Sequence, residues 1–127
     1  MTGEPISAEL RRFLLASRIG VPHVEAILLI RRSRGVRWNA ARLAARIYVA
    51  PKAAEEILTD LGGVGLLDAP DAEGQTYAPA TPELAAVIDD LDATYSRHLI
   101  EVTRLIHSAR DQSAAGFAAA FRLRKES

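Results

Sequence analysis

The sequence contains no cysteine, and only one tryptophan and one methionine among its 127 residues. The absence of cysteine excludes disulfides, a thiolate metal site and a thiol nucleophile. The longest aliphatic stretch, residues 26–30, is far shorter than the ~20 residues that cross a bilayer. Residues 1–5 carry no positive charge and no apolar run of the signal-peptide kind. We therefore expect a cytoplasmic protein that does not enter a membrane.

The sequence also lacks the residue spacings of known catalytic and metal sites. Two of its three histidines, His98 and His107, are nine residues apart, so they do not form a metal pair on one helical turn, and His23 is distant. Residues 62–65 are rich in glycine, but they follow a predicted helix and precede an extended run, the reverse of a phosphate-binding loop. We expect no enzymatic activity, no catalytic residue, no metal and no cofactor.

Charge is unevenly distributed along the chain, although the net charge is zero. Residues 1–50 carry nine arginines against three acids, residues 51–96 carry one lysine against ten acids, and residues 97–127 carry six bases against three acids. Such asymmetry concerns the partners of a protein rather than its fold. Three acids lie close together, at Asp89, Asp90 and Asp92. Adjacent helical residues point to different sides, so a solvated acidic face is favoured over a cation site.

Hydrophobic periodicity predicts a mainly helical chain. The four helices expected first cover residues 7–18, 22–34, 40–48 and 51–61. Ser7 and Asn39 are suited to cap the first and the third of them, because their side chains accept hydrogen bonds from free backbone N–H groups. Trp38, just before the third helix, is expected to cover the core.

The segment after residue 64 has a different pattern. Two short extended runs, within residues 65–68 and 75–78, flank a stretch rich in Pro, Asp and Gly, which predicts a β-hairpin. Residues 68–74 are small and polar, so we expect a mobile loop without an apolar anchor. Thr81 is suited to cap a long helix over residues 81–110.

The order of these elements resembles a winged helix-turn-helix. The segment Trp38-Asn39-Ala40-Ala41-Arg42-Leu43-Ala44 resembles the start of the second helix in that superfamily. Leu58-x-x-Leu61-x-x-x-Gly65-Leu66-Leu67 resembles its third helix running into the wing, and Tyr77-Ala78-Pro79 the returning strand. The resemblance covers residues 21–80 and is closest in style to bacterial regulators of the MarR and related groups.

The resemblance implies a mainly α fold with a small β-hairpin. We expect a single domain over residues 1–127, organised as a winged helix-turn-helix with an N-terminal helix and a long C-terminal helix. Its parts are the N-terminal helix at 7–18, the winged helix-turn-helix at 21–80, the long dimerisation helix at 81–110 and a tail at 111–127. The implied function is a dimeric DNA-binding transcriptional regulator of bacterial type.

The charges of the predicted reading helix and wing oppose this function. In winged helices the third helix usually enters the major groove and the wing touches the backbone. Here these elements hold one base, Lys52, against six acids: Glu55, Glu56, Asp60, Asp68, Asp71 and Glu73. Because cations that replace counterions supply much of the affinity for DNA, this surface should be repelled. The candidate DNA-binding residues are therefore chiefly arginines: Arg34, Arg37, Arg42 and Arg46, with Lys52 and Thr59.

Two interpretations of these arginines stay open. They form a patch that contacts phosphates, or Arg42 and Arg46 pair with the acidic third helix beside them. The alternative function is a winged-helix protein–protein interaction module that does not bind DNA and takes a protein partner through its acidic face.

A heptad pattern runs along the predicted long helix. Its seam positions, spaced alternately four and three residues apart, are Leu84, Ile88, Leu91, Tyr95, His98, Val102 and Leu105. A helix of about 30 residues is about 45 Å long, more than a small domain covers. We therefore expect a homodimer, with Val102 beyond the reach of the winged core. The candidate interface residues are Leu10, Phe13, Leu91, Tyr95, His98, Val102 and Leu105.

Overall fold

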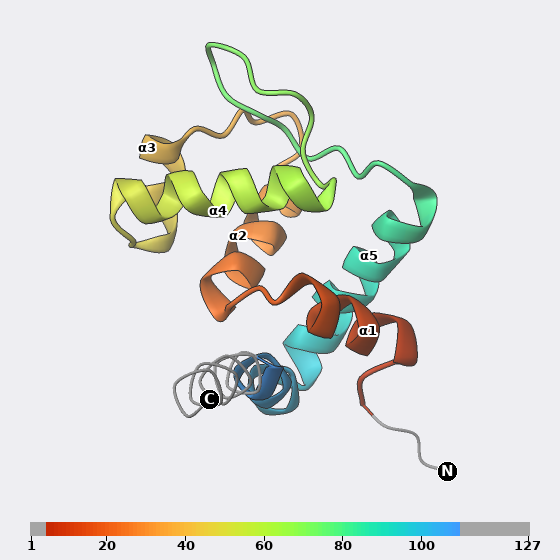
Figure 1. Ribbon diagram of the computed structural model, residues 1–127. Helices are drawn as coiled ribbons and strands as arrows, with labels where there is room; N and C mark the ends of the chain where they lie inside the picture. The colour runs from red at the N-terminus through yellow and green to blue at the C-terminus, as the bar shows by residue number, and fades with distance from the viewer. Residues whose placement is uncertain (1–4, 110–127) are drawn as a thin grey trace, which may run out of the picture.

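The computed structural model describes residues 5–109, and within them the chain is mainly helical, as the sequence predicts. The helices are α1 (Ala8–Ser17), α2 (Val21–Arg32), α3 (Ala40–Ile47), α4 (Pro51–Val64), α5 (Pro82–Arg97) and a last helix whose described part covers residues 99–109. Figure 1 shows α3, α4 and the loop after α4 at one end of the molecule, and α1 with the last helix at the other. The predicted tail at 111–127 lies outside the described residues.

Local sequence signals start the helices. Ser7, Asn39 and Thr81 occupy N-cap positions, and each side-chain oxygen accepts from the backbone N–H three residues later, at 3.1, 2.8 and 3.0 Å. Pro51 and Pro82 are the first residues of α4 and α5, where a missing N–H costs no hydrogen bond. The three predicted caps are confirmed.

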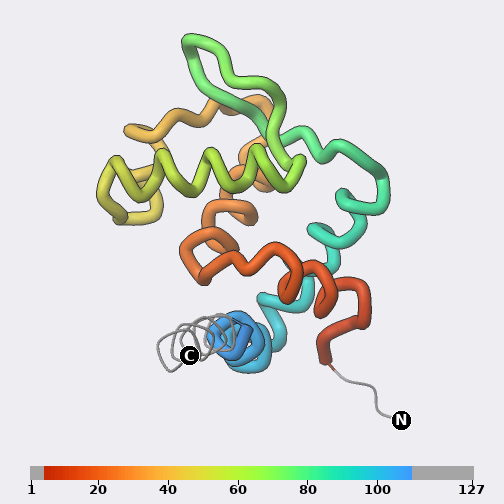
Figure 2. The backbone as a smooth tube through the Cα atoms, viewed as in Figure 1, coloured from red at the N-terminus to blue at the C-terminus, as the bar shows by residue number. Residues whose placement is uncertain are grey.

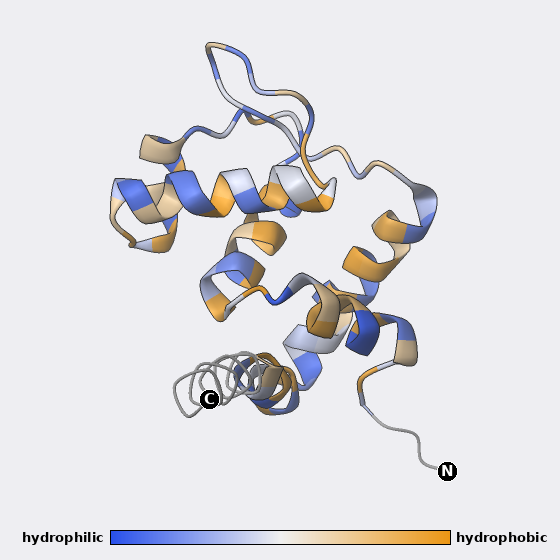
Figure 3. Cartoon of the chain, in the orientation of Figure 1, coloured by the Kyte–Doolittle hydropathy of each residue, from blue (hydrophilic) through white to orange (hydrophobic). Residues whose placement is uncertain are grey.

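One hydrophobic core joins the helices. α2 contributes buried residues on most of its sides, and α3 packs closely against α4. Trp38 is 1% exposed, so the expectation that it covers the core is confirmed. The largest fully buried side chains come from all six helices and from the segments that join them: Trp38, Leu10, Leu14, Ile27, Ile30, Leu43, Leu61, Leu66, Ile88, Leu91, Ile106 and Val24. Figure 3 shows hydrophilic residues interrupting hydrophobic ones along α4, as one buried face requires.

The expected β-hairpin after α4 is not supported, because residues 5–109 contain no regular strand. The chain makes three isolated antiparallel bridges instead, Trp38–Gln75, Leu67–Tyr77 and Asp71–Gly74. Gln75 exchanges both backbone hydrogen bonds with Trp38, at 2.7 and 2.9 Å, and the N–H of Thr76 donates to the Asp68 side chain at 2.7 Å instead of to a backbone carbonyl of the other run. The two runs are therefore held to each other only in places.

The loop at residues 68–74 is anchored, contrary to the sequence-based expectation. Gly74 is buried with a φ of +126°, and a Cβ atom there would lie 2.6 Å from the carbonyl carbon of Trp38. Asp68 holds the base of the loop, because its carboxylate accepts from the backbone N–H and the hydroxyl of Thr76, both at 2.7 Å. The loop therefore packs on the segment that precedes α3.

The expected long helix at 81–110 is interrupted at His98. α5 ends at Arg97, His98 has φ −131° and ψ 50°, and a new helix begins at residue 99. The chain turns there, as Figure 2 shows where the tube passes from cyan to blue. Val102, expected to lie beyond the core, is 0% exposed in the single chain. The break allows the apolar side of the second segment to be buried, which a straight helix would project into solvent.

The helices within residues 5–109 can be compared with the length and composition that a membrane span needs. No single helix there is both long and apolar enough to span a bilayer, and α1 and α2, which together pass on length and composition, are bent by 118°.

The contact between Gly74 and Trp38 predicts that Gly74→Ala lowers the free energy of unfolding by about 2–4 kcal/mol, since a methyl group must displace backbone and φ is positive. Gly63→Ala is the matched control, because Gly63 lies in α4 with no atom within 4 Å of a new Cβ. It should raise the free energy of unfolding by about 0.5 kcal/mol. Urea unfolding followed by circular dichroism measures both, and equal stability of the two variants would contradict the anchored loop.

Candidate nucleic-acid interface

The outer face of α3 carries two of the candidate DNA-binding arginines. Leu43 and Ala44 point into the core, and Arg42 and Arg46 are exposed one turn apart on the other side. The other outward residues of this helix are the small Ala41 and Ala45. A partner can therefore approach the backbone of α3 closely between the two guanidinium groups.

The contacts of these arginines orient them without neutralising them. Arg42 Nη1 donates to the carbonyl oxygen of Arg37 at 2.9 Å. The guanidinium of Arg46 lies 5.9 Å from the centre of the Trp38 ring. Neither arginine pairs with an acid among residues 5–109, so the pairing with α4 that the sequence left open is not found. Both charges are available to a partner.

The other four candidates divide into two kinds. Arg34, before α3, and Lys52, in the first turn of α4, are exposed and have no acidic partner within the described part of the chain. Arg37 is paired with the loop, since its guanidinium lies 2.7 Å from Asp71 and 3.6 Å from a Glu73 oxygen. Thr59 is exposed, but its hydroxyl donates to a carbonyl oxygen of its own helix at 3.0 Å.

Four of the six acids that oppose DNA binding have partners. Asp60 is hydrogen-bonded to His23 at 2.8 Å, and the remaining pairs are Asp68–Thr76, Asp71–Arg37 and Glu73–Arg37. Gly20 N–H donates to His23 Nδ1 at 3.3 Å, so Nε2 is the nitrogen that donates to Asp60. The other two acids are Glu55 and Glu56 of α4. Within residues 5–109, their carboxylates accept no hydrogen bond and form no ion pair. Arg37 therefore offsets one of these six negative charges, and hydrogen bonds from uncharged groups cancel none of the others.

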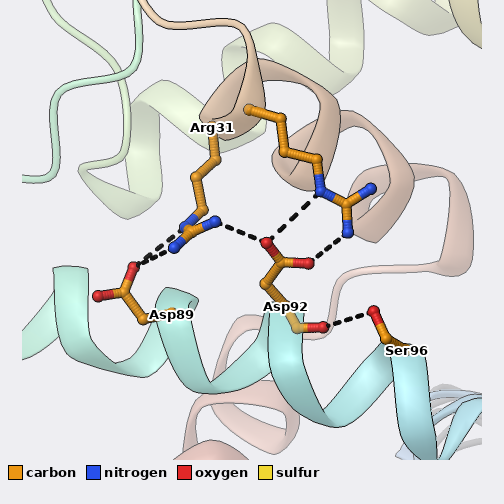
Figure 4. A network of polar contacts seen from close by, with 5 residues as sticks. Arg31, Asp89, Asp92 and Ser96 are labelled. Atoms are coloured by element: carbon orange, nitrogen blue, oxygen red, sulfur yellow. Dashed lines mark hydrogen bonds and ion pairs between the residues drawn. The ribbon is translucent and has the colours of Figure 1, made fainter.

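A cluster of ion pairs joins the end of α2 to α5 (Figure 4). Arg31 lies 2.8 Å from Asp89 and 2.6 Å from Asp92, and Arg32 also contacts Asp92. The hydrogen bond to Asp89 raises the pKa of Arg31, and desolvation lowers it by less. The expected solvated acidic face is therefore a contact between helices, and Arg31 and Arg32 are not part of the free cations.

The candidate dimer residues also divide by burial. Leu10, Leu91 and Val102 are fully buried inside the single chain and belong to its core. Phe13, Tyr95, His98 and Leu105 are partly exposed. The most exposed large aliphatic residues of the described part of the chain lie directly after the break in the long helix: Leu99 at 51% and Ile100 at 65%. Leu99 flanks the predicted heptad seam, whereas Ile100 does not belong to it, and the seam continues through His98 without a signal of the break.

Comparison of the chain with protein-family models, with curated proteins and with solved structures finds no match. Among the described residues, no group of three or more His, Asp or Glu side chains is placed to hold a metal ion.

The hydrogen bonds from Thr76 predict a pH dependence of stability. They lower the pKa of Asp68 in the folded chain, so its carboxylate stabilises the fold above the unfolded value of about 3.9. This stabilisation is lost as the pH falls through the lower folded value. At pH 7, Asp68→Asn should lower Tm by about 2–4 °C, and the difference should shrink as the pH falls below the unfolded value of about 3.9.

The measurement is thermal unfolding of both proteins from pH 7 to pH 2.5. Glu56→Gln is the control, since it removes a carboxylate that lacks these hydrogen bonds, and its Tm at pH 7 should equal that of the wild type. A constant difference between Asp68→Asn and the wild type at all pH values would contradict the role of the ionised carboxylate.

Proposed function

We propose that this chain is a DNA-binding transcriptional regulator of bacterial type that acts as a homodimer. The observation that supports this best is the set of exposed cations around α3 and the start of α4, which have no acidic partner within residues 5–109: Arg34, Arg42, Arg46 and Lys52. Between Glu25 and Glu55 the sequence holds seven bases and no acid. Cations arranged in this way replace the counterions of phosphates, which is the main source of affinity for DNA.

The packing of the helices is compatible with a winged helix-turn-helix. α2 contacts both α3 and α4, the turn between α3 and α4 is short, and the chain after α4 returns past Trp38. In this proposal the loop at residues 66–80 is the wing, and the isolated bridges take the place of a strand ladder. Arg37 pairs with both acids at its tip and offsets one of their two negative charges, which lowers the repulsion between the loop and a phosphate backbone.

The charges of α4 favour an approach of DNA to one end of the helix. Lys52 lies in its first turn, six residues after Arg46 of α3, and Glu55 and Glu56 follow one turn later. The phosphate contacts then come from α3 and the start of α4, and the acids face the bases, where a carboxylate can accept from a cytosine amino group.

A protein partner is the second candidate function. The observation that favours it is the same pair of acids, Glu55 and Glu56, which are exposed on α4 without an acid-neutralising partner in the described part of the chain. A basic protein surface would pair with them, and a DNA backbone would be repelled. The DNA-binding experiment separates the two functions.

The DNA proposal predicts that Arg42→Ala with Arg46→Ala weakens binding to all sequences. The loss of two phosphate contacts should flatten the plot of log affinity against log salt by about two units. The measurement is fluorescence anisotropy of labelled duplexes from the DNA flanking the protein's own gene, from 50 to 200 mM salt.

The matched control is Arg97→Ala with Arg104→Ala, which removes the same charge from exposed positions on α5 and the last helix. Its salt dependence should equal that of the wild type. Equal effects of the two double variants would show that only the net charge matters. If the wild type binds no duplex at ~50 mM salt, the DNA proposal is wrong and the protein-binding function takes its place.

The dimer proposal now rests on the surface at Leu99 and Ile100, with the partly exposed Phe13 and Tyr95. Leu99→Glu with Ile100→Glu should convert the dimer to a monomer, because two charges would be buried against an apolar partner. Light scattering on a sizing column measures the mass at ~50 μM. The control is Ala41→Glu with Ala45→Glu, two exposed positions of α3, which should stay dimeric. A monomeric wild type at that concentration would refute the dimer.

A further inference from the structure

The side chain of Tyr48 is almost fully exposed. It lies in the turn between α3 and α4 and is 91% exposed, the largest value among the exposed large hydrophobic residues of the described chain. A tyrosine usually buries most of its ring or bonds its hydroxyl to the protein. Residues 5–109 provide neither for Tyr48, so this side chain contributes almost nothing to the packing of the chain.

The backbone of Tyr48 is in the left-handed region, with φ 59° and ψ 49°. The turn requires this conformation, because the N–H groups of Tyr48 and Val49 both donate to the carbonyl oxygen of Ala44 and close the end of α3. Glycine adopts the conformation without strain and is the usual residue at such a helix end. A tyrosine there is strained and gains no burial in return. Its presence is better explained by a contact outside the chain.

The surroundings of Tyr48 identify the chemistry of that contact. Arg46 lies two residues before it and Lys52 four residues after it, both exposed and without an acidic partner within the described chain. No acid occurs between residues 26 and 54. Tyr48 therefore lies between two exposed cations in the sequence of the α3–α4 turn. This charge is complementary to a polyanion and unfavourable for a basic protein surface.

We propose that Tyr48 contacts the sugar–phosphate backbone of duplex DNA. The phenol hydroxyl donates a hydrogen bond to a phosphate oxygen, the ring packs on the neighbouring deoxyribose, and Arg46 and Lys52 pair with flanking phosphates. Tyrosine suits this place because contacts to phosphates and sugars come from hydroxyl donors as well as from cations. The inference rests on the proposed DNA-binding function and adds to it one specific uncharged contact.

The test uses the full chain and three variants of Tyr48. Tyr48→Gly relieves the left-handed strain and loses no buried contact, so Tm should rise by about 3 °C. Its affinity for duplex DNA should fall about tenfold at ~100 mM salt, because it loses both the hydroxyl and the ring. Tyr48→Asn, which also tolerates the left-handed region, should behave like Tyr48→Gly. Tyr48→Phe should keep the wild-type Tm and lose about threefold in affinity.

Opposite changes in stability and binding distinguish a contact residue from a structural one. A fall in Tm for Tyr48→Gly would show that the tyrosine supports the fold, and would overturn the inference. So would unchanged DNA affinity in that variant while the Arg42 and Arg46 double variant binds weakly, and the proposed function would then stand. Because Tyr48 is uncharged, the slope of affinity against salt should be the same in Tyr48→Phe and the wild type. If no protein binds duplex DNA at ~50 mM salt, the proposed function fails and this inference fails with it.

Discussion

The arrangement of the end of the molecule that carries the exposed cations, at α3 and the start of α4, depends on Trp38. We call it the cationic end. Its side chain is buried in the core, and its backbone exchanges two hydrogen bonds with Gln75. The carbonyl group leaves no room for a side chain at Gly74, and the ring lies under the guanidinium of Arg46. The next residue, Asn39, caps α3. One residue thus fixes the loop after α4, the start of α3 and the position of an exposed cation relative to the core.

Some arginines of the chain pair with acidic side chains, and others do not. Arg31 and Arg32 join α2 to Asp89 and Asp92 of α5, and Arg37 binds the acids of the loop. These contacts are partly exposed, so each contributes little to the free energy of unfolding. Their larger effect is on the surface, because they remove charge from one side and leave it on α3. A chain with zero net charge therefore presents a cationic end without an excess of bases.

Features encoded by neighbouring residues could be predicted from the sequence. The caps at Ser7, Asn39 and Thr81 each depend on residues three apart, and the helices follow from apolar periodicity. The absence of a regular hairpin could not be predicted from neighbouring residues, because Gln75 pairs with Trp38, which is distant in sequence. The pairing of Arg31 with Asp89 spans 58 residues and has no local signal. Tertiary contacts between residues distant in sequence determine both the pairing of Gln75 and the ion pair of Arg31.

The break at His98 shows another limit of pattern reasoning. A heptad seam describes which residues share a face if the helix is straight, and it does not show that the helix is straight. Here the residues on both sides of the break are apolar in the expected register, yet Leu91 and Val102 serve the core of one chain. Leu99 and Ile100, next to the break, are the exposed ones. Exposure therefore marks a different candidate dimer surface from the one that periodicity predicts.

The proposals of DNA binding and of a dimer support each other through the number of charges. Each chain offers four unpaired cations at the α3 end within its described residues: Arg34, Arg42, Arg46 and Lys52. At about 0.9 counterions released per phosphate contact, one chain yields a salt slope of at most about 4, below that of proteins that make 6–10 contacts. A dimer doubles the contacts on one duplex and turns the second binding event into an intramolecular one. Glu55 and Glu56 then repel any DNA sequence whose bases do not offer a matching hydrogen-bond donor. These acids lower the total affinity for DNA, and they raise the difference in affinity between one DNA sequence and another.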